Sequence, residues 1–242
     1  MTDISTEIIK RNLEIAQVVQ EMRTGDYVVL RNLGFNRLPE ESRDESIRDL
    51  CLRAGALSMS GTDVKTDVWY LDETKSKPGS VPYHTDNPHF TLPEQIVGFW
   101  CVQSSGNGGE NLIVSGADIV NWLDLNKIKD STGQSFSQRV TSERVLFGYG
   151  SRSVSSTIYD EETGIFRLGN YASDEETKKL VTELSGVIEQ GRDTIPAKKI
   201  LMEPGDVLFF NNHTHLHARD PYVSNSQTSP VEKRLVLRTR II

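Results

Sequence analysis

Apolar positions in the first part of the chain predict two helices with a strand between them. Apolar side chains recur at helical spacing from Ile8 to Met22, and the pair Thr24-Gly25 ends that pattern. The short apolar run from Tyr27 to Leu30 is typical of a strand. A second helix is expected between Pro39, a favoured first-turn residue, and Gly55, a favoured terminator.

The middle of the chain changes from a long polar stretch to strand and helix patterns. Residues 59–93 have no regular apolar period, and an irregular segment of that length in a compact domain usually carries function. The segment from Gln95 to Gln103 is typical of a buried strand. Further on, Ser173 and Glu176 predict a capping box. It would open a helix whose apolar face holds Leu180, Leu184, Val187 and Ile188.

Strand patterns dominate the C-terminal part of the chain. They cover residues 199–202, 207–211 and 234–242, with a turn at Pro204-Gly205. Helices therefore come first and strands follow without regular alternation, which favours a mainly β fold with flanking α-helices. A jelly roll of two antiparallel sheets fits this order. Because no repeat or linker interrupts the pattern, residues 1–242 are expected to form a single domain.

The composition, with 36% hydrophobic and 25% charged residues, is that of an ordinary globular protein. The net charge of -7 and the isoelectric point of about 5.3 argue against nucleic acid or an anionic membrane as a partner, because both need a basic surface. Cys51 and Cys101 have neither metal-site nor disulfide spacing. Since no signal-peptide pattern or membrane-length apolar run is visible, a cytoplasmic location is expected.

All five histidines fall into two short clusters. His84 and Asp86, with His89 behind them, form the first, and the second holds His213, His215 and His217. In an extended segment two residues of spacing i, i+2 point to the same side, so His84 and Asp86 can bind one ion. A further imidazole from the second cluster would complete the two-histidine, one-carboxylate set typical of iron(II). Periodicity alone does not choose among its three histidines.

Several segments carry a more specific signal. They are His84-Thr85-Asp86-Asn87, Pro93, Phe99-Trp100-Cys101-Val102, Gly108-Gly109-Glu110-Asn111, Asn212 to Arg219, and Lys233 to Arg238. In sequence and order they resemble the taurine dioxygenase and clavaminate synthase-like family of iron(II)- and 2-oxoglutarate-dependent oxygenases. The resemblance implies a double-stranded β-helix, which is a jelly roll with a cupin-like core. It also implies an enzyme that takes iron(II) as its metal, with 2-oxoglutarate and O2 as cosubstrates.

The same resemblance assigns roles to individual residues. His84, Asp86 and His217 would bind the metal, with His217 chosen by its spacing from Asn212 and His215 as the alternative. Arg234 would clamp the distal carboxylate of 2-oxoglutarate. Asn111 would contact this cosubstrate at a position where the family often has threonine, and an asparagine amide can still donate a hydrogen bond there.

The last predicted strand places Arg234, Arg238 and Arg240 on one face. Guanidinium groups on a buried strand face need anionic partners, and a carboxylate provides two parallel hydrogen bonds. By the same family resemblance, Arg238 would lie near the cosubstrate or an acidic group of the substrate. Arg167, followed by Asn170 and Tyr171, is a second candidate for substrate binding. Residues 62–83 are further candidates, and residues 224–227 form either a lid or an exposed insertion.

The expected reaction is hydroxylation of an unactivated C–H bond in a small polar metabolite, an amino acid or a derivative, with release of succinate and CO2. Asp86 favours hydroxylation over halogenation, because halogenating relatives lack the carboxylate. Desaturation or cyclisation at the same metal site remains an alternative, as does a zinc-dependent or non-catalytic cupin-like metal protein. The only expected partner is a small-molecule substrate, and the oligomeric state stays open, a homo-oligomer included.

Overall fold

The computed structural model describes residues 27–40, 42–43, 45–47, 67–71, 79–104, 107–222 and 235–241, with backbone alone for 67–71 and 240–241. Residues 40, 42–43 and 45–47 are helical, which confirms the start of the second predicted helix. The remainder of that helix, the helix pattern of 8–22, Cys51, Arg234 and residues 224–227 lie outside the described residues.

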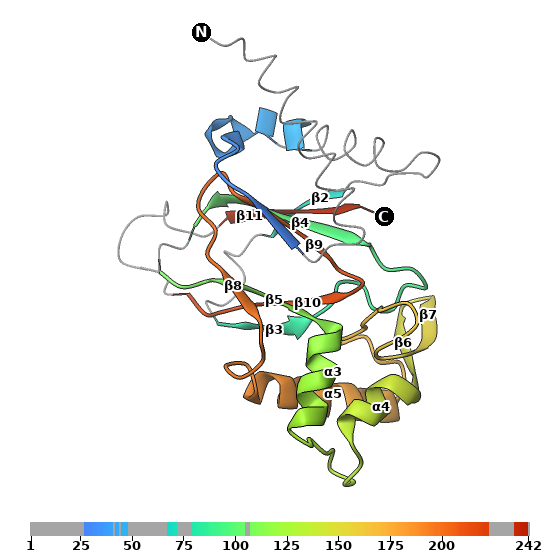
Figure 1. Ribbon diagram of the computed structural model, residues 1–242. Helices are drawn as coiled ribbons and strands as arrows, with labels where there is room; N and C mark the ends of the chain where they lie inside the picture. Colours follow the sequence, from blue (N-terminus) through green and yellow to red (C-terminus); the bar gives the residue numbers. More distant parts are fainter. Residues whose placement is uncertain are drawn as a thin grey trace.

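Two antiparallel sheets stack face to face (Figure 1). One has the order β1-β9-β4-β11-β2 and the other the order β3-β10-β5-β8. A separate hairpin, β6–β7, lies beside them. The strand bounds are β1 Tyr27–Leu30, β2 Asp67–Leu71, β3 Val81–His84, β4 Ile96–Gln103, β5 Asn111–Ser115, β6 Arg144–Tyr149, β7 Arg152–Thr157, β8 Lys198–Ile200, β9 Val207–Asn211, β10 His215–Arg219 and β11 Leu235–Ile241.

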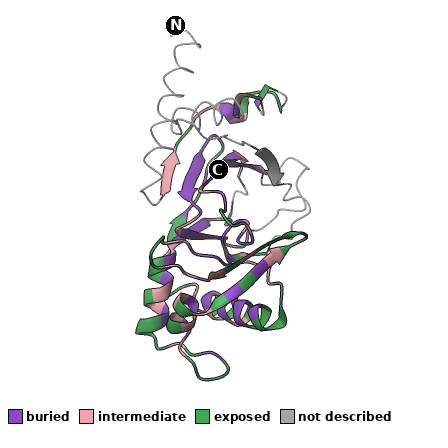
Figure 2. Cartoon of the chain, turned by 90° about the vertical axis from the view of Figure 1, so that its right-hand side faces the viewer, coloured by how far each residue is buried: buried purple, intermediate pink, exposed green. Residues whose placement is uncertain are grey.

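Side chains from both sheets fill the space between them. This inner core holds Val97, Phe99, Cys101, Ile113, Ile200, Met202, Leu208, Phe210 and Val236. Because side chains alternate along a strand, the same strands also present an outer apolar face. Leu216 and Ala218 of β10 therefore belong to a second core. Figure 2 shows the strands mostly in the colour of buried residues, while the helices are exposed on their outer sides.

The second core lies between the β3-β10-β5-β8 sheet and three helices, α3 Gly116–Leu125, α4 Phe136–Ser142 and α5 Glu175–Gln190 (Figure 1). The Ser115 hydroxyl caps α3 by accepting a hydrogen bond from the Asp118 backbone N–H. The predicted capping box of α5 is wrong by one residue. Asp174, not Ser173, is the N-cap, and its carboxylate accepts from the Thr177 backbone N–H.

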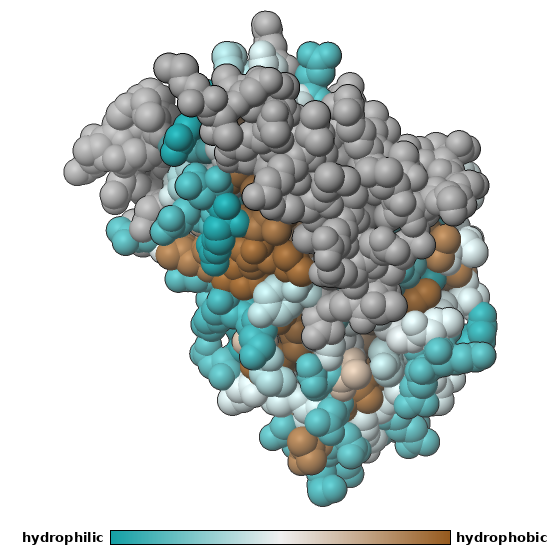
Figure 3. Space-filling view, turned by 45° about the horizontal axis from the view of Figure 1, so that its top comes forward, coloured by the Kyte–Doolittle hydropathy of each residue, from teal (hydrophilic) through white to brown (hydrophobic). Residues whose placement is uncertain are grey.

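The structure confirms the predicted mainly β double sheet but corrects parts of it. Residues 59–93 are not one irregular stretch, because they contain β2 and β3. Helices α3 and α4 and the β6–β7 hairpin were not predicted. In the part of the chain that the structure describes, no helix is both long enough and apolar enough to cross a membrane. The described surface in Figure 3 is mostly teal and white, and its largest brown, apolar area adjoins the atoms drawn in grey.

Candidate metal centre

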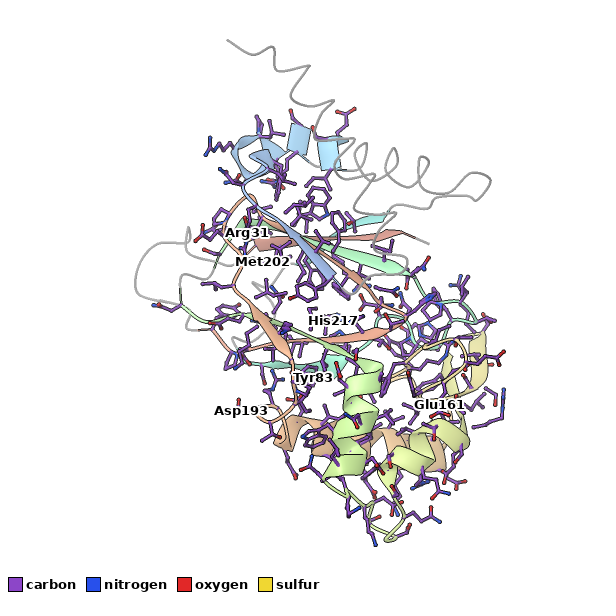
Figure 4. All side chains as sticks on the ribbon, in the orientation of Figure 1. Arg31, Tyr83, Glu161, Asp193, Met202 and His217 are labelled. Atoms are coloured by element: carbon purple, nitrogen blue, oxygen red, sulfur yellow. The ribbon has the colours of Figure 1, made fainter. Side chains whose placement is uncertain are left out.

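The pairing of β3 with β10 places His84 directly opposite His217. Their ring centroids are 4.1 Å apart. His217 extends into the space between the two sheets (Figure 4), where its ring lies against Phe99 and Phe210. The register of a buried sheet is strongly specified, because a shift by one residue would move every side chain to the other face. The backbone ladder therefore holds both imidazoles in place.

The surroundings of both imidazoles suit metal binding. His84 Nδ1 donates a hydrogen bond to the Pro82 carbonyl oxygen, at 2.9 Å, so Nε2 is the nitrogen that this ring turns toward Asp86 and could offer to a metal. Burial, followed by the neighbouring His84 and Arg238, holds the pKa of His217 well below 6.5. His217 is therefore neutral near pH 7 and can offer a lone pair to a cation.

Asp86 supplies the carboxylate just beyond the end of β3. Its Oδ1 lies 3.8 Å from His84 Nε2 and 4.0 Å from His217 Nε2. Its Oδ2 lies 2.9 Å from Nη2 of Arg238, which extends inward from β11. The two oxygens are thus divided between the histidine pair and one guanidinium group.

These three side chains fit a single metal ion. They are a group of His and Asp residues whose ligand atoms all lie within 4.8 Å of one another. Two donors that each bind an ion at about 2.2 Å can be up to about 4.4 Å apart, and both oxygen–nitrogen separations to Asp86 are shorter. Two imidazoles and one carboxylate on one side of an ion are the donor set of mononuclear iron(II) sites that leave other positions open.

The other histidines lie apart from this group. His215 is buried on β10, and its Nδ1 is 2.9 Å from the Thr214 hydroxyl. His213 Nε2 donates to the Pro93 carbonyl oxygen at 2.8 Å. His89 is buried against Phe90 and Tyr171. The structure therefore brings His217, and not His215, next to His84 and Asp86.

Two further polar residues share the inner face with His217. Asn111 is buried on β5 and pairs across the sheet with Arg219 of β10. The turn before Asn111 contains Gly108 and Gly109, with φ of 75° and 78°, a conformation that glycine adopts without strain. Arg219 was not predicted as a site residue, although its i, i+2 spacing from His217 already places both side chains on one face.

Arg167, a candidate for substrate binding, makes hydrogen bonds to the backbone. Its guanidinium group is buried and donates to the carbonyl oxygens of Pro88, Phe90 and Thr91, at 2.7 to 2.9 Å. These bonds hold the segment that follows the His84–Asp86 pair. Arg238 does lie at the metal site, while Arg234 is outside the described residues.

The model of the "Taurine catabolism dioxygenase TauD, TfdA family" matches residues 9–240, nearly the whole chain. The chain belongs to this family. It is therefore a 2-oxoglutarate-dependent oxygenase that uses iron, in agreement with its His84, Asp86 and His217 group. No curated protein matches the chain.

Solved structures share the fold at low sequence identity. An asparagine oxygenase in complex with Fe(II), 2S,3S-3-hydroxyasparagine and succinate is 13% identical, with a TM-score of 0.61 over 97% of this chain and 79% of that one. PvcB from Pseudomonas aeruginosa is 17% identical, with a TM-score of 0.59 over 94% and 79%. The oxygenase OrfP with Fe and alpha-ketoglutaric acid is 12% identical, with a TM-score of 0.57 over 94% and 79%. These likenesses confirm the double-stranded β-helix.

Proposed function

We propose that this protein hydroxylates an unactivated C–H bond of a free amino acid or a close derivative. One C–H bond of the substrate and one O2 molecule would be consumed together with 2-oxoglutarate. One oxygen atom would enter the substrate as a hydroxyl group and the other would enter succinate, with release of CO2. The observation that carries the proposal is the complete His84, Asp86 and His217 group, because its carboxylate is retained.

The residues between the two sheets would have different roles in this reaction. His84, Asp86 and His217 would hold iron(II), which supplies the activation of O2 at its open positions. Phe99 and Phe210 border His217 with apolar surface and so limit the access of water to that side. Arg238 lies at the carboxylate ligand, and we propose that it also approaches the cosubstrate or an acidic group of the substrate.

We propose that 2-oxoglutarate binds between the two sheets on the side where Asn111 lies. Asn111 is buried on the inner face of β5, next but one to Ile113, which pairs with His217. Its amide would donate to a carboxylate of 2-oxoglutarate, and Arg234 would bind the distal carboxylate. A substrate contact of Arg167 would have to come from Nε or from the second N–H of Nη2, because both N–H groups of Nη1 and one of Nη2 already donate to loop carbonyl groups.

Amino acids are proposed as substrates on the basis of the solved relatives. One of them was crystallised with 2S,3S-3-hydroxyasparagine and succinate, and OrfP with succinate and (3R,4R)-dihydroxy-L-Arg. The test is succinate formation by anaerobically purified protein supplied with iron(II), 2-oxoglutarate and O2, across the free amino acids and their simple derivatives. We expect one compound to stimulate succinate formation and to gain one oxygen atom. If the compound that stimulates succinate formation loses two hydrogen atoms and gains no oxygen, the reaction is desaturation or cyclisation, and the hydroxylation proposal is overturned.

A further inference from the structure

Asn212 connects the metal-site aspartate to the strand of the distal histidine. It follows β9 directly, in the turn that leads to β10, and its side chain is 1% exposed. Its Oδ1 accepts a hydrogen bond from the Asp86 backbone N–H at 2.8 Å. Its Nδ2 donates to the Asp86 carbonyl oxygen at 3.2 Å and to the Glu94 carbonyl oxygen at 3.0 Å. One side-chain amide thus binds both backbone polar groups of Asp86.

Asp86 needs such a partner because the sheet does not hold it. Strand β3 ends at His84, which is paired with His217, so Asp86 lies beyond the ladder. The next residue, Asn87, has a φ of 49°, and its carbonyl oxygen accepts from the Phe90 backbone N–H, so a turn and not an extended strand follows the aspartate. A buried backbone N–H or C=O without a partner is costly, and the Asn212 amide satisfies one of each at Asp86.

This amide clamp on Asp86 lies in the connection between β9 and β10, which leads directly to the strand of His217. The Asn212 backbone N–H donates to the Gln95 carbonyl oxygen at 2.8 Å, and the following residue, His213, binds the Pro93 carbonyl oxygen. The turn between β9 and β10 is therefore attached to both ends of the segment from Asp86 to Gln95. A displacement of that segment relative to His217 would have to break these bonds.

We infer that Asn212 is a positioning residue for metal binding: it fixes the backbone of Asp86 at a set distance from His217, so that the carboxylate is in place before the metal arrives. The inference rests on the proposed metal role of His84, Asp86 and His217. Partners that orient a metal ligand typically contribute about 10- to 100-fold to metal affinity. Loss of the Asn212 amide should weaken iron(II) binding within this range.

The test compares full-length wild type with Asn212→Ala, Asn212→Ser and a matched control, Asn211→Ala. Asn211, the last residue of β9, is also buried, but its Oδ1 accepts from the His213 backbone N–H and not from Asp86. The iron(II) dissociation constant is measured anaerobically by chelator competition, and the unfolding midpoint is recorded with and without the metal. We expect at least tenfold weaker binding and a smaller metal-induced rise in midpoint for both Asn212 variants, whereas Asn211→Ala binds nearly as tightly as wild type.

Equal iron(II) affinity in wild type and in a folded Asn212 variant would overturn the inference, while wild-type iron binding and turnover would still uphold the proposed function. A failure of wild type to bind iron(II) would instead refute the proposed function. If neither Asn212 variant folds, the inference is tested by the rate of amide hydrogen exchange at Asp86 in metal-free wild type. Protection of the Asp86 N–H supports the clamp, and exchange as fast as in an exposed loop refutes it.

Discussion

The histidines and the aspartate of the metal site are positioned by different kinds of structure. His84 and His217 face each other across the β3–β10 ladder, so backbone hydrogen bonds set their distance. Asp86 lies beyond the ladder and is held by the Asn212 amide and by Arg238. A ladder survives most single side-chain changes, whereas a residue held by two side chains depends on both. Substitutions of neighbouring side chains should therefore displace the Asp86 carboxylate more than they displace the two imidazoles.

The largest effect is expected from removal of an imidazole from the ladder. His217→Ala removes one of three metal ligands, so iron(II) binding and succinate formation should fall to background. His215→Ala is the matched control on the same strand, and it should keep both because His215 lies outside the ligand group. Iron content after anaerobic loading measures the difference. Retention of iron by His217→Ala together with loss in His215→Ala would move the distal ligand to His215.

A second substitution tests the segment that follows the aspartate. Arg167→Met leaves three carbonyl oxygens, those of Pro88, Phe90 and Thr91, without their charged donor. We expect the free energy of unfolding to fall by about 3 kcal/mol. Arg152→Met is the control, because Arg152 is exposed and only lies over the Phe90 ring, a contact worth about 1 kcal/mol or less. Urea unfolding of both variants gives the comparison, and equal losses would refute a structural role of Arg167.

A substitution of Arg238 distinguishes neutralisation of the Asp86 charge from positioning of the Asp86 backbone. Arg238→Met leaves the buried Asp86 carboxylate without its ion-pair partner, so the metal-free protein should lose about 2 kcal/mol of unfolding free energy. A bound cation would replace the lost positive charge. The metal-induced rise in unfolding midpoint should therefore exceed that of wild type, the opposite of the result expected for Asn212→Ala. A rise smaller than that of wild type would contradict this role.

The smallest effect is the contribution of one histidine, His213, to the pH dependence of stability. Burial lowers the pKa of both His89 and His213 below 6.5, so the unfolded chain takes up their protons first as the pH falls. The unfolding free energy of the metal-free protein should therefore decrease below about pH 6.5, by at most about 1.4 kcal/mol per histidine and pH unit. Urea unfolding at about pH 7.5 and about pH 5.5 measures it. His213→Gln should give a shallower dependence, and an unchanged slope would contradict the contribution of His213.

Sequence patterns predicted those parts of the molecule in which the signal is local. The i, i+2 spacing of His84 and Asp86, the apolar runs of β4 and β9, and the helical face of α5 all lie within a few residues. A local signal for α3 was overlooked. Ser115 is a favoured N-cap, and Ile119 and Leu123, four residues apart, form the buried face of the helix. The α5 cap was misplaced because Ser173 and Asp174 are adjacent and both are favoured N-caps.

Contacts between distant segments could not be read from these patterns. The period of two places His215 and His217 on the same face of the strand. The pairing of His217 with His84 is what identifies His217 as the histidine next to the first ligand pair. The pairing of Arg238 with Asp86 and the burial of Arg167 under the 88–91 backbone depend on how separate strands and loops meet. Strand β2 did carry a local signal, the run from Val68 to Leu71, but this short run was overlooked within the polar stretch around it. The roles of Arg234 and of residues 224–227 stay predictions.

The most direct test of the metal site is anaerobic addition of 2-oxoglutarate to the iron(II)-loaded protein, followed by visible absorption. Chelation of the metal by the cosubstrate requires open positions beside His84, Asp86 and His217. We expect a charge-transfer band in wild type and in His215→Ala, and no band in His217→Ala. Tight iron(II) binding without any band in wild type would show that 2-oxoglutarate does not reach the metal, which would contradict the proposed oxygenase reaction.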